Sequence, residues 1–208
     1  ATCERHLSLQ ATTVLDDRGR PAGTSIVIRD VTELSALLAR LRDLASTDVL
    51  TGLMNRRSFF ELAQRDIEVA RRTGRRFVVG IADIDHFKLV NDRYGHAVGD
   101  QALRTAAGRF LSCLRSTDLV CRYGGEEFAF LFPECELEAG RRTAERLREA
   151  LASSPVRTDQ GEIALSASFG LCASLAQPGE DLDSLLKRAD EALYQAKDRG
   201  RNQVCVSS

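Results

Sequence analysis

Three acidic residues follow apolar stretches at spacings that could support metal-dependent chemistry. Asp83 follows the apolar run 77–82, and Glu126 and Glu127 come directly after a pair of glycines. If the two segments are neighbouring strands, the carboxylates converge, and such like charges are costly unless a divalent cation neutralises them. Oxygen ligands favour Mg²⁺ or Mn²⁺, and Mg²⁺ usually bridges substrate phosphates. Together the acids indicate a nucleoside triphosphate site, whereas each alone is better explained as a surface acid beside a turn.

The glycine pair, Gly124 and Gly125, separates two apolar stretches. Two glycines suit a tight hairpin turn that needs positive φ, and they leave room for a base or a phosphate to approach the backbone. Because ordinary hairpins use the same dipeptide, the pair by itself does not distinguish a site from a turn.

Helical and strand patterns alternate through the segment that contains these residues. The spacing predicts helices at 58–72, 100–114, 138–151 and 182–197, and strands at 77–84, 119–123, 128–132 and 163–173. Ser58 is available to cap the first helix, whose inward face comprises Phe59, Leu62, Ala63, Ile67 and Ala70. The inward face of the last helix comprises Leu182, Leu185, Leu186, Ala189, Leu193 and Ala196. Helices mixed with strands that include a hairpin indicate an α+β fold, a sheet with helical cover.

The first part of the chain has a different pattern. Strands are expected at 7–15 and 24–28 around a turn rich in Asp and Gly. Two strands cannot bury a core, so we expect them to be a fragment of a larger domain. Next, Leu34, Leu37, Leu41 and Leu44 follow the a/d spacing of a coiled coil. Two heptads fit either a coiled coil or packing of this helix on its own domain.

The composition excludes several classes of protein. The formal net charge of -1 argues against a surface for duplex nucleic acid. No apolar run reaches the roughly 20 residues of a membrane helix, so we expect no direct membrane contact. The sequence has no leader and no starting Met, so we expect it to begin inside a longer protein. A cytoplasmic location is expected for this segment, with room for a membrane anchor upstream.

Two further groups of residues have simple explanations. The six cysteines show no paired short spacing, which favours free thiols in a reducing compartment over a zinc site or disulfides. Arg71, Arg72, Arg75 and Arg76 surround Gly74, as expected at the solvated end of a helix, where cations favour the dipole.

Four motifs in order resemble those of the GGDEF diguanylate cyclase family. The opening motif is matched by Asp-Val-Leu-Thr-Gly-Leu-Met-Asn-Arg-Arg at 48–57. The substrate-binding stretch is matched by Asp-Ile-Asp-His-Phe-Lys-Leu-Val-Asn-Asp at 83–92 and Tyr-Gly-His-Ala-Val-Gly-Asp at 94–100. The signature loop, in its Glu variant, is matched by Arg-Tyr-Gly-Gly-Glu-Glu-Phe at 122–128, and the closing motif by Ala-Leu-Tyr-Gln-Ala-Lys-Asp-Arg-Gly-Arg-Asn at 192–202.

The resemblance implies an architecture. The fold would be a nucleotidyl-cyclase-like palm with a central, mainly antiparallel sheet covered by helices, preceded by a helical linker. Arg29-Asp30-Val31-Thr32-Glu33 also resembles the end of a PAS sensor domain. The expected domains are therefore a PAS-like C-terminal fragment at 1–32, the linker at 33–47 and the cyclase domain at 48–208.

The resemblance also implies roles for matching residues. Asp83, Glu127 and the Ile84 carbonyl would bind Mg²⁺ or Mn²⁺, and Glu126 would be the catalytic acid of the signature. The substrate contacts would come from Phe87, Lys88, Asn91, Asp100, Gly124, Gly125, Lys197 and Arg201, with Asn91 and Asp100 reading guanine and the cations holding phosphates. Lys197 and Arg201 stand four apart at a helix end, so both could face one anion.

The implied reaction joins two GTP molecules into cyclic di-GMP. Each domain would hold one GTP, so a homodimer is required, and positioning would supply much of the rate. In the family, Arg115, Asp118 and Arg146 would form a product-inhibition site, since the Arg fork binds guanine acceptors and phosphate. A surface ion pair between Arg115 and Asp118 is the simpler alternative.

Three other functions fit parts of the sequence. A module that binds GTP or cyclic di-GMP without turnover is disfavoured by the intact acids. A cyclase with relaxed base choice is disfavoured by Asp100, which suits guanine. A polymerase relative would need a basic cleft for its template, which this sequence lacks.

Overall fold

The computed structural model describes residues 5, 7–33, 46–159, 161–174 and 180–207. The chain divides into two compact units, residues 1–45 and 46–208, and each is described by itself. The four leucines of the expected linker helix lie outside the described residues.

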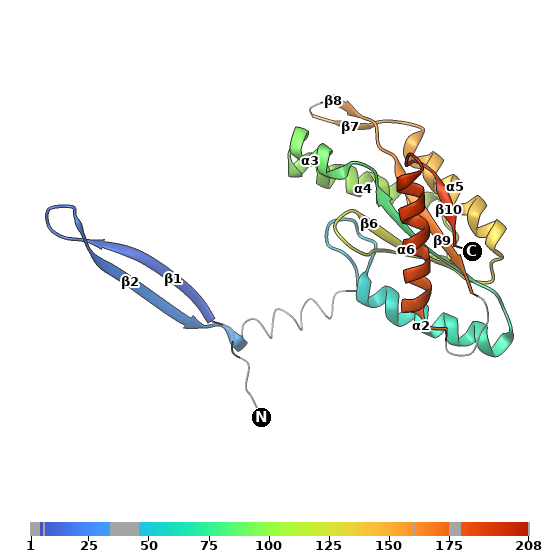
Figure 1. The fold of residues 1–208 in the computed structure, drawn as a ribbon, viewed down its shortest axis with the longest axis horizontal. Helices are drawn as coiled ribbons and strands as arrows, with labels where there is room; N and C mark the ends of the chain where they lie inside the picture. Colours follow the sequence, from blue (N-terminus) through green and yellow to red (C-terminus); the bar gives the residue numbers. More distant parts are fainter. Residues whose placement is uncertain (1–4, 6, 34–45, 160, 175–179, 208) are drawn as a thin grey trace. The chain divides into compact units, whose positions relative to one another are not determined.

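The first unit contains an antiparallel ribbon (Figure 1). Strand β1 spans Leu7–Leu15 and β2 spans Pro21–Asp30, so the two predicted strands form and the second is longer than expected. Leu9 pairs with Ile28 across the ribbon, and their exposed fractions are 64% and 59%. The described ribbon therefore has apolar side chains on its surface, as expected of strands that cannot bury a core alone.

The second unit is built on a six-stranded sheet in the order β10-β9-β4-β6-β5-β3. Its strands are β3 (Met54–Asn55), β4 (Val78–Ile84), β5 (Leu119–Arg122), β6 (Glu127–Phe132), β9 (Ala167–Ala173) and β10 (Val204–Val206). The four central strands pair antiparallel, and β3 and β10 add in parallel at the edges. The expected mainly antiparallel sheet is confirmed. A separate ribbon joins β7 (Val156–Thr158) to β8 (Gly161–Ile163).

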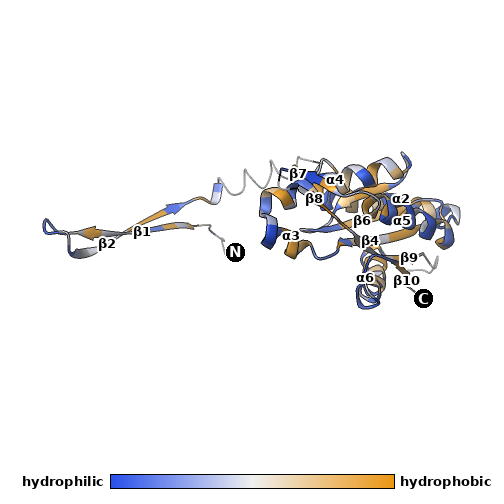
Figure 2. Ribbon diagram, turned by 90° about the horizontal axis from the view of Figure 1, so that it is seen from above, coloured by the Kyte–Doolittle hydropathy of each residue, from blue (hydrophilic) through white to orange (hydrophobic). Residues whose placement is uncertain are grey.

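Helices cover both faces of this sheet. They are α2 (Arg56–Thr73), α3 (Phe87–Tyr94), α4 (His96–Cys113), α5 (Leu137–Ala152) and α6 (Leu182–Asp198). Figure 2 shows α4 on one side of β4 and β6 and α6 on the other. On the α4 side, the Phe110 ring lies 5.2 Å from Phe128 and 5.7 Å from Phe130. The α+β, cyclase-like palm expected from the sequence is confirmed.

Some boundaries differ from the prediction. Helix α2 is capped by Asn55, whose side chain accepts the Ser58 N–H at 2.9 Å, so Ser58 is not the cap. Leu62 was assigned to its inward face but is 39% exposed. The predicted helix at 100–114 begins at His96, directly after Gly95, and the sequence patterns gave no separate helix for α3.

The predicted strand at 163–173 is two strands, β8 and β9, with 164–166 between them. At this break the Asp85 N–H donates to the Ser166 carbonyl at 2.9 Å, and the Ser166 hydroxyl donates to the Asp85 carboxylate at 2.7 Å. Polar contacts with the end of β4 therefore replace regular sheet pairing there.

Helix α6 lies unusually close to β9 because residue 170 is a glycine. A Cβ on Gly170 would overlap the Ala189 carbonyl and the Leu193 nitrogen of the helix backbone. The six inward residues expected of α6 are all buried. This close packing directs the last turn of α6, with Lys197, toward the end of β4.

Candidate active site

Asp83 and Glu127 are cross-strand partners at the end of the β4–β6 pair. Directly paired residues point to the same face of a sheet, so the two carboxylates share one face. The Ile84 N–H donates to the Glu126 carbonyl at 3.2 Å, which brings the third acid to the same strand end. The fold therefore brings Asp83 to the same strand end as Glu126 and Glu127, which lie more than 40 residues later in the sequence.

The charges at this strand end act on one another. Burial raises the pKa of Asp83, and its ion pair with Lys197, 2.9 Å from Nζ to Oδ2, lowers it by less. Burial also raises the pKa of Glu126, and the neighbouring carboxylates of Asp83 and Glu127 add to that rise. Negative charge is therefore incompletely compensated here, and a divalent cation would stabilise it.

The carboxylates do not form a complete metal cage by themselves. Among the described residues, no three His, Cys, Asp or Glu side chains lie together as a metal-binding group. The expected ligand set fits that arrangement, because it combines two carboxylates with the Ile84 carbonyl and leaves positions for phosphate oxygens and water.

The two glycines of the hairpin act differently from the prediction. Neither has positive φ; instead the N–H groups of Tyr123 and Gly124 both donate to the Glu127 carbonyl, at 2.8 and 3.2 Å. A Cβ on Gly124 would overlap the Glu127 carboxylate, whereas one on Gly125 would meet open space. Gly124 thus makes room for an acid of the site itself, and Gly125 leaves the approach to the loop open.

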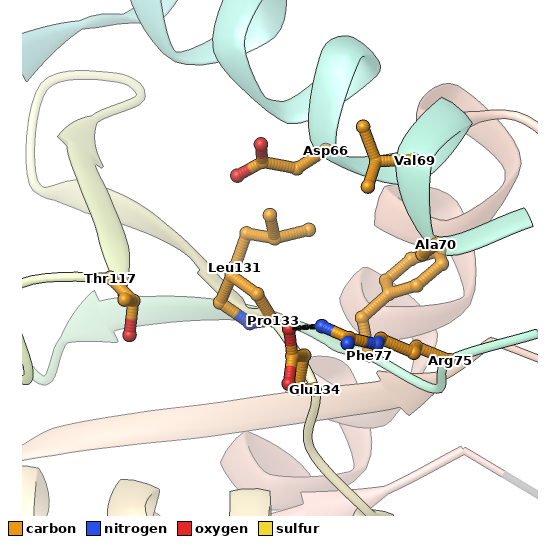
Figure 3. Close-up of a pocket in the computed structure, with 9 residues that line it drawn as sticks. All are labelled: Asp66, Val69, Ala70, Arg75, Phe77, Thr117, Leu131, Pro133 and Glu134. Carbon is orange, nitrogen blue, oxygen red and sulfur yellow. Dashed lines mark hydrogen bonds and ion pairs between the residues drawn. The ribbon is translucent and has the colours of Figure 1, made fainter. Parts of the chain in front are cut away.

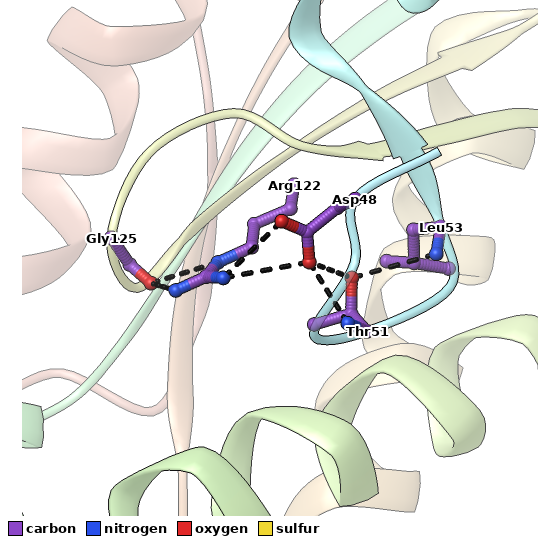
Figure 4. A network of polar contacts seen from close by, with 5 residues as sticks. All are labelled: Asp48, Thr51, Leu53, Arg122 and Gly125. Carbon is purple, nitrogen blue, oxygen red and sulfur yellow. Dashed lines mark hydrogen bonds and ion pairs between the residues drawn. The ribbon is translucent and has the colours of Figure 1, made fainter. Parts of the chain in front are cut away.

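Arg122 and Asp48 hold this loop in place through hydrogen bonds and an ion pair (Figure 4). The Arg122 guanidinium donates to the Gly125 carbonyl at 2.8 and 3.1 Å, and lies 3.3 Å from the Asp48 carboxylate. Asp48 also accepts the N–H and the hydroxyl of Thr51, at 2.8 and 2.6 Å. The sequence analysis did not assign either residue to the site, although each lies in one of the four motifs. Their opposite charges were the feature that could have indicated an ion pair.

Asn91 and Asp100 lie on consecutive helices that meet at Gly99. Asn91 is on α3, and a Cβ on Gly99 of α4 would overlap its side-chain oxygen. The Asn91 amide therefore packs against the residue next to half-buried Asp100. Phe87 and Lys88 begin α3, a helix start with no side-chain cap, where backbone N–H groups can receive an anion.

Lys197 and Arg201 reach the site by different routes, contrary to the expected common helix. Helix α6 ends at Asp198. Arg201 follows Gly200 in a left-handed conformation, with φ of 65°. Both charges nevertheless act on Asp83 and partly offset the rise in its pKa that burial causes. The two cations therefore lie near the same carboxylate although they are not on one helical face.

The structure ties the three residues of the expected inhibitory site to one stretch of chain, residues 113–118. The Asp118 carboxylate accepts the Arg115 N–H at 2.9 Å, so it closes a turn. Arg146 on α5 donates to the Cys113 carbonyl at 3.0 Å, two residues before Arg115. The side chains of Arg115 and Arg146 are exposed.

A pocket of about 270 Å³ lies on the α2 side of the sheet (Figure 3). Phe77, Leu131 and Pro133 form its apolar part, and the Arg75–Glu134 ion pair stands at its edge. None of its nine lining residues is an expected site residue, although Thr117 of the wall lies between Arg115 and Asp118.

The comparison with protein families decides what kind of domain this is. The family described as "Diguanylate cyclase, GGDEF domain" matches residues 45–203. The chain belongs to the GGDEF family. Response regulator PleD of Caulobacter vibrioides is 44% identical over 165 residues, covering 78% of this chain and 36% of PleD. Diguanylate cyclase DgcP of Pseudomonas aeruginosa is 40% identical, covering 80% of this chain and 24% of DgcP.

Solved structures agree with the family. The GGDEF domain of DgcB from Caulobacter crescentus, in complex with c-di-GMP, superposes with a TM-score of 0.75 at 36% identity. That match covers 78% of this chain and 96% of the DgcB chain. This GGDEF protein thus spans well under half the length of PleD and DgcP. Within its described residues, no helix is long and apolar enough to cross a membrane.

Proposed function

We propose that this GGDEF protein is a diguanylate cyclase that joins two GTP molecules into cyclic di-GMP and releases pyrophosphate. The observation that carries the proposal is the cross-strand pair of Asp83 and Glu127 beside Lys197. The activity named for DgcP supports the same conclusion.

Asp83, Glu127 and the Ile84 carbonyl would hold Mg²⁺ or Mn²⁺. Oxygen donors and incompletely compensated negative charge fit such an ion. When bound, the ion neutralises charge that develops around the α-phosphorus and lowers the pKa of the attacking hydroxyl.

The base and the phosphates of GTP contact different elements. Asn91 and Asp100 hydrogen-bond to guanine, with the Asp100 carboxylate accepting from the ring N–H and the exocyclic amine. Gly124 and Gly125 give the nucleotide access to the loop. The phosphates are held by the Phe87 backbone, Lys88, Lys197 and Arg201.

The reaction requires two such sites. The 3′-hydroxyl of one GTP loses its proton, bonds to the α-phosphorus of the other and displaces pyrophosphate; the second, reciprocal step closes the ring. The carboxylate of Glu126, the signature residue that is not a metal ligand, accepts the proton. Because each domain binds one GTP, two chains must face each other as a homodimer, and their orientation supplies much of the rate.

Product inhibition is assigned to Arg115, Asp118 and Arg146. Two exposed guanidinium groups near one turn suit a ligand with guanine acceptors and phosphates. Upstream, residues 1–32 are a PAS-like fragment and residues 33–47 a helical linker that holds the two cyclase domains together. The linker leucines lie outside the described residues, so this role rests on their sequence spacing.

Incubation of the full chain with GTP and Mg²⁺, followed by chromatography and mass spectrometry, tests the proposal. We expect cyclic di-GMP and two equivalents of pyrophosphate, and no product from Glu126→Gln. Asp92→Asn, an exposed acid on α3, is the matched control and should remain active. GTP binding without product would instead support the non-catalytic module, and equal turnover of ATP would contradict the role of Asp100.

A further inference from the structure

Asp85 is a buried carboxylate that the proposed reaction does not use. It lies two residues after Asp83 and is only 6% exposed. The Ser168 hydroxyl donates to its Oδ1 at 2.7 Å. The Ser166 hydroxyl and the Asn202 N–H donate to its Oδ2, at 2.7 and 3.1 Å. A buried carboxylate is tolerated when it accepts such hydrogen bonds, and both of its oxygens are already engaged.

The Asn202 contact matters because of the backbone around it. Arg201 and Asn202 have φ values of 65° and 45°, a left-handed conformation that residues with a Cβ seldom adopt, above all two in succession. Such backbone persists only where its surroundings hold it, and it occurs often at functional sites.

Three hydrogen bonds of Arg201 and Asn202 hold this turn in place. The Arg201 N–H donates to the Ala196 carbonyl at 3.0 Å, and Arg148 donates to the Asn202 side-chain oxygen at 3.1 Å. The third is the bond from the Asn202 N–H to Asp85. It is the one that ties the turn to the segment that carries Asp83, and so to the strand end where Arg201 acts.

We infer that Asp85 is a positioning residue that holds the Gly200–Asn202 turn, so that the Arg201 guanidinium faces the triphosphate. The inference rests on the proposed function, because Arg201 binds phosphate only if the substrate is a nucleotide. An Asp-x-Asp spacing would also suit a third metal ligand, but three donors already occupy the Asp85 oxygens. Asp85 therefore acts through Arg201 and does not itself touch substrate.

Steady-state kinetics on the full chain test this role. Asp85→Ala removes both acceptor oxygens, so the Asn202 N–H loses its partner. We expect KM for GTP to rise about tenfold, as for Arg201→Ala, with a smaller change in kcat. When Asp85→Ala is combined with Arg201→Ala, KM should be no higher than for Arg201→Ala alone, because the two residues act as one unit.

Ser168→Ala is the matched control. It removes the donor to Oδ1 and leaves the oxygen that accepts the Asn202 N–H, so KM should stay near the wild-type value. A second variant, Asp85→Ala with Asn202→Gly, should recover part of the lost affinity, because glycine adopts positive φ without strain. This recovery also separates positioning from general damage to folding.

Two readouts do not depend on turnover. Binding of pyrophosphate should weaken in Asp85→Ala while binding of guanosine stays unchanged. Amide hydrogen exchange at Asn202 should accelerate in Asp85→Ala and not in Ser168→Ala. A wild-type chain that neither binds nor converts GTP would refute the proposed function, and the exchange experiment would still report on the turn. Wild-type KM in Asp85→Ala, multiplicative effects when Asp85→Ala is combined with Arg201→Ala, or unchanged exchange would overturn the positioning role.

Discussion

Lys197 pairs with Asp83 across the space where β4 and α6 end, with 2.9 Å between Nζ and Oδ2. In the proposed cycle, the triphosphate would draw Lys197 away and leave the Asp83 carboxylate to the divalent cation, so substrate and metal together would replace this ion pair.

Asp83→Asn should lower the rate of product formation at least about a hundredfold, because the expected cation loses a charged ligand. GTP binding without metal should persist, since Lys197 is then free to contact phosphate. Turnover with Mg²⁺ and nucleotide titration with EDTA measure the two effects. Asp92→Asn should match the wild type in both, and equal turnover in Asp83→Asn would contradict the assignment.

Alanine at the two loop glycines should have different effects. In Gly124→Ala the new Cβ displaces the Glu127 carboxylate, so about tenfold more Mg²⁺ should be needed for half-maximal activity. In Gly125→Ala the Cβ points into open space, so the Mg²⁺ requirement should stay and KM for GTP should rise. Measuring activity at increasing Mg²⁺ and, separately, at increasing GTP compares the two variants. The same change in both variants would refute these separate roles of the two glycines.

Asp48→Asn should destabilise the domain in a pH-dependent way. Burial tends to raise the pKa of Asp48, but the hydrogen bonds from Thr51 and the charge of Arg122 hold it below its ordinary value of 3.8. A carboxyl with a lowered pKa contributes stability above its unfolded-state pKa, and this contribution is lost as pH falls through the folded-state value.

We therefore expect the free energy of unfolding of Asp48→Asn to be about 1–2 kcal/mol below wild type at neutral pH. The gap should narrow as pH falls from about 5 toward about 3. Urea denaturation at several pH values measures it, with Asp92→Asn as the control. A gap that stays constant with pH would show that the charge of Asp48 is not its source.

Arg115→Ala should relieve inhibition by cyclic di-GMP without raising the rate of product-free enzyme. The reason is that the Arg115 guanidinium is exposed at a turn that carries none of the active-site acids. Initial rates at increasing product concentration test it, beside Arg146→Ala. Arg141→Ala, which affects an exposed arginine paired with Glu138 on the same helix, serves as control. Unchanged inhibition in Arg115→Ala would exclude this site.

Replacing Leu37 and Leu41 with Glu should abolish dimerisation and turnover together, because charges at a and d positions cannot be buried between helices. Light scattering after size exclusion and the cyclase assay measure both properties. GTP binding by each domain should survive as an internal control. Full activity of the double variant would mean that the linker does not hold the dimer.

The sequence by itself determined much of this protein. Apolar periodicity predicted the helices α2, α5 and α6 and the strands β4, β5 and β6 within a few residues, because period and burial are local properties of the chain. Motif order identified the family and the residues to examine. The same local signals failed at 163–173, where Ser166 bonds to Asp85 instead of continuing the strand.

Only the tertiary structure decided how distant residues meet. Pairing of Asp83 with Glu127 depends on β4 lying between β6 and β9, an order that no local pattern encodes. The space at Gly124 is filled by Glu127, and Arg201 arrives through a left-handed turn tied to Asp85. These relationships arise from long-range packing and side-chain hydrogen bonds, which the order of residues specifies only once the whole sheet has formed.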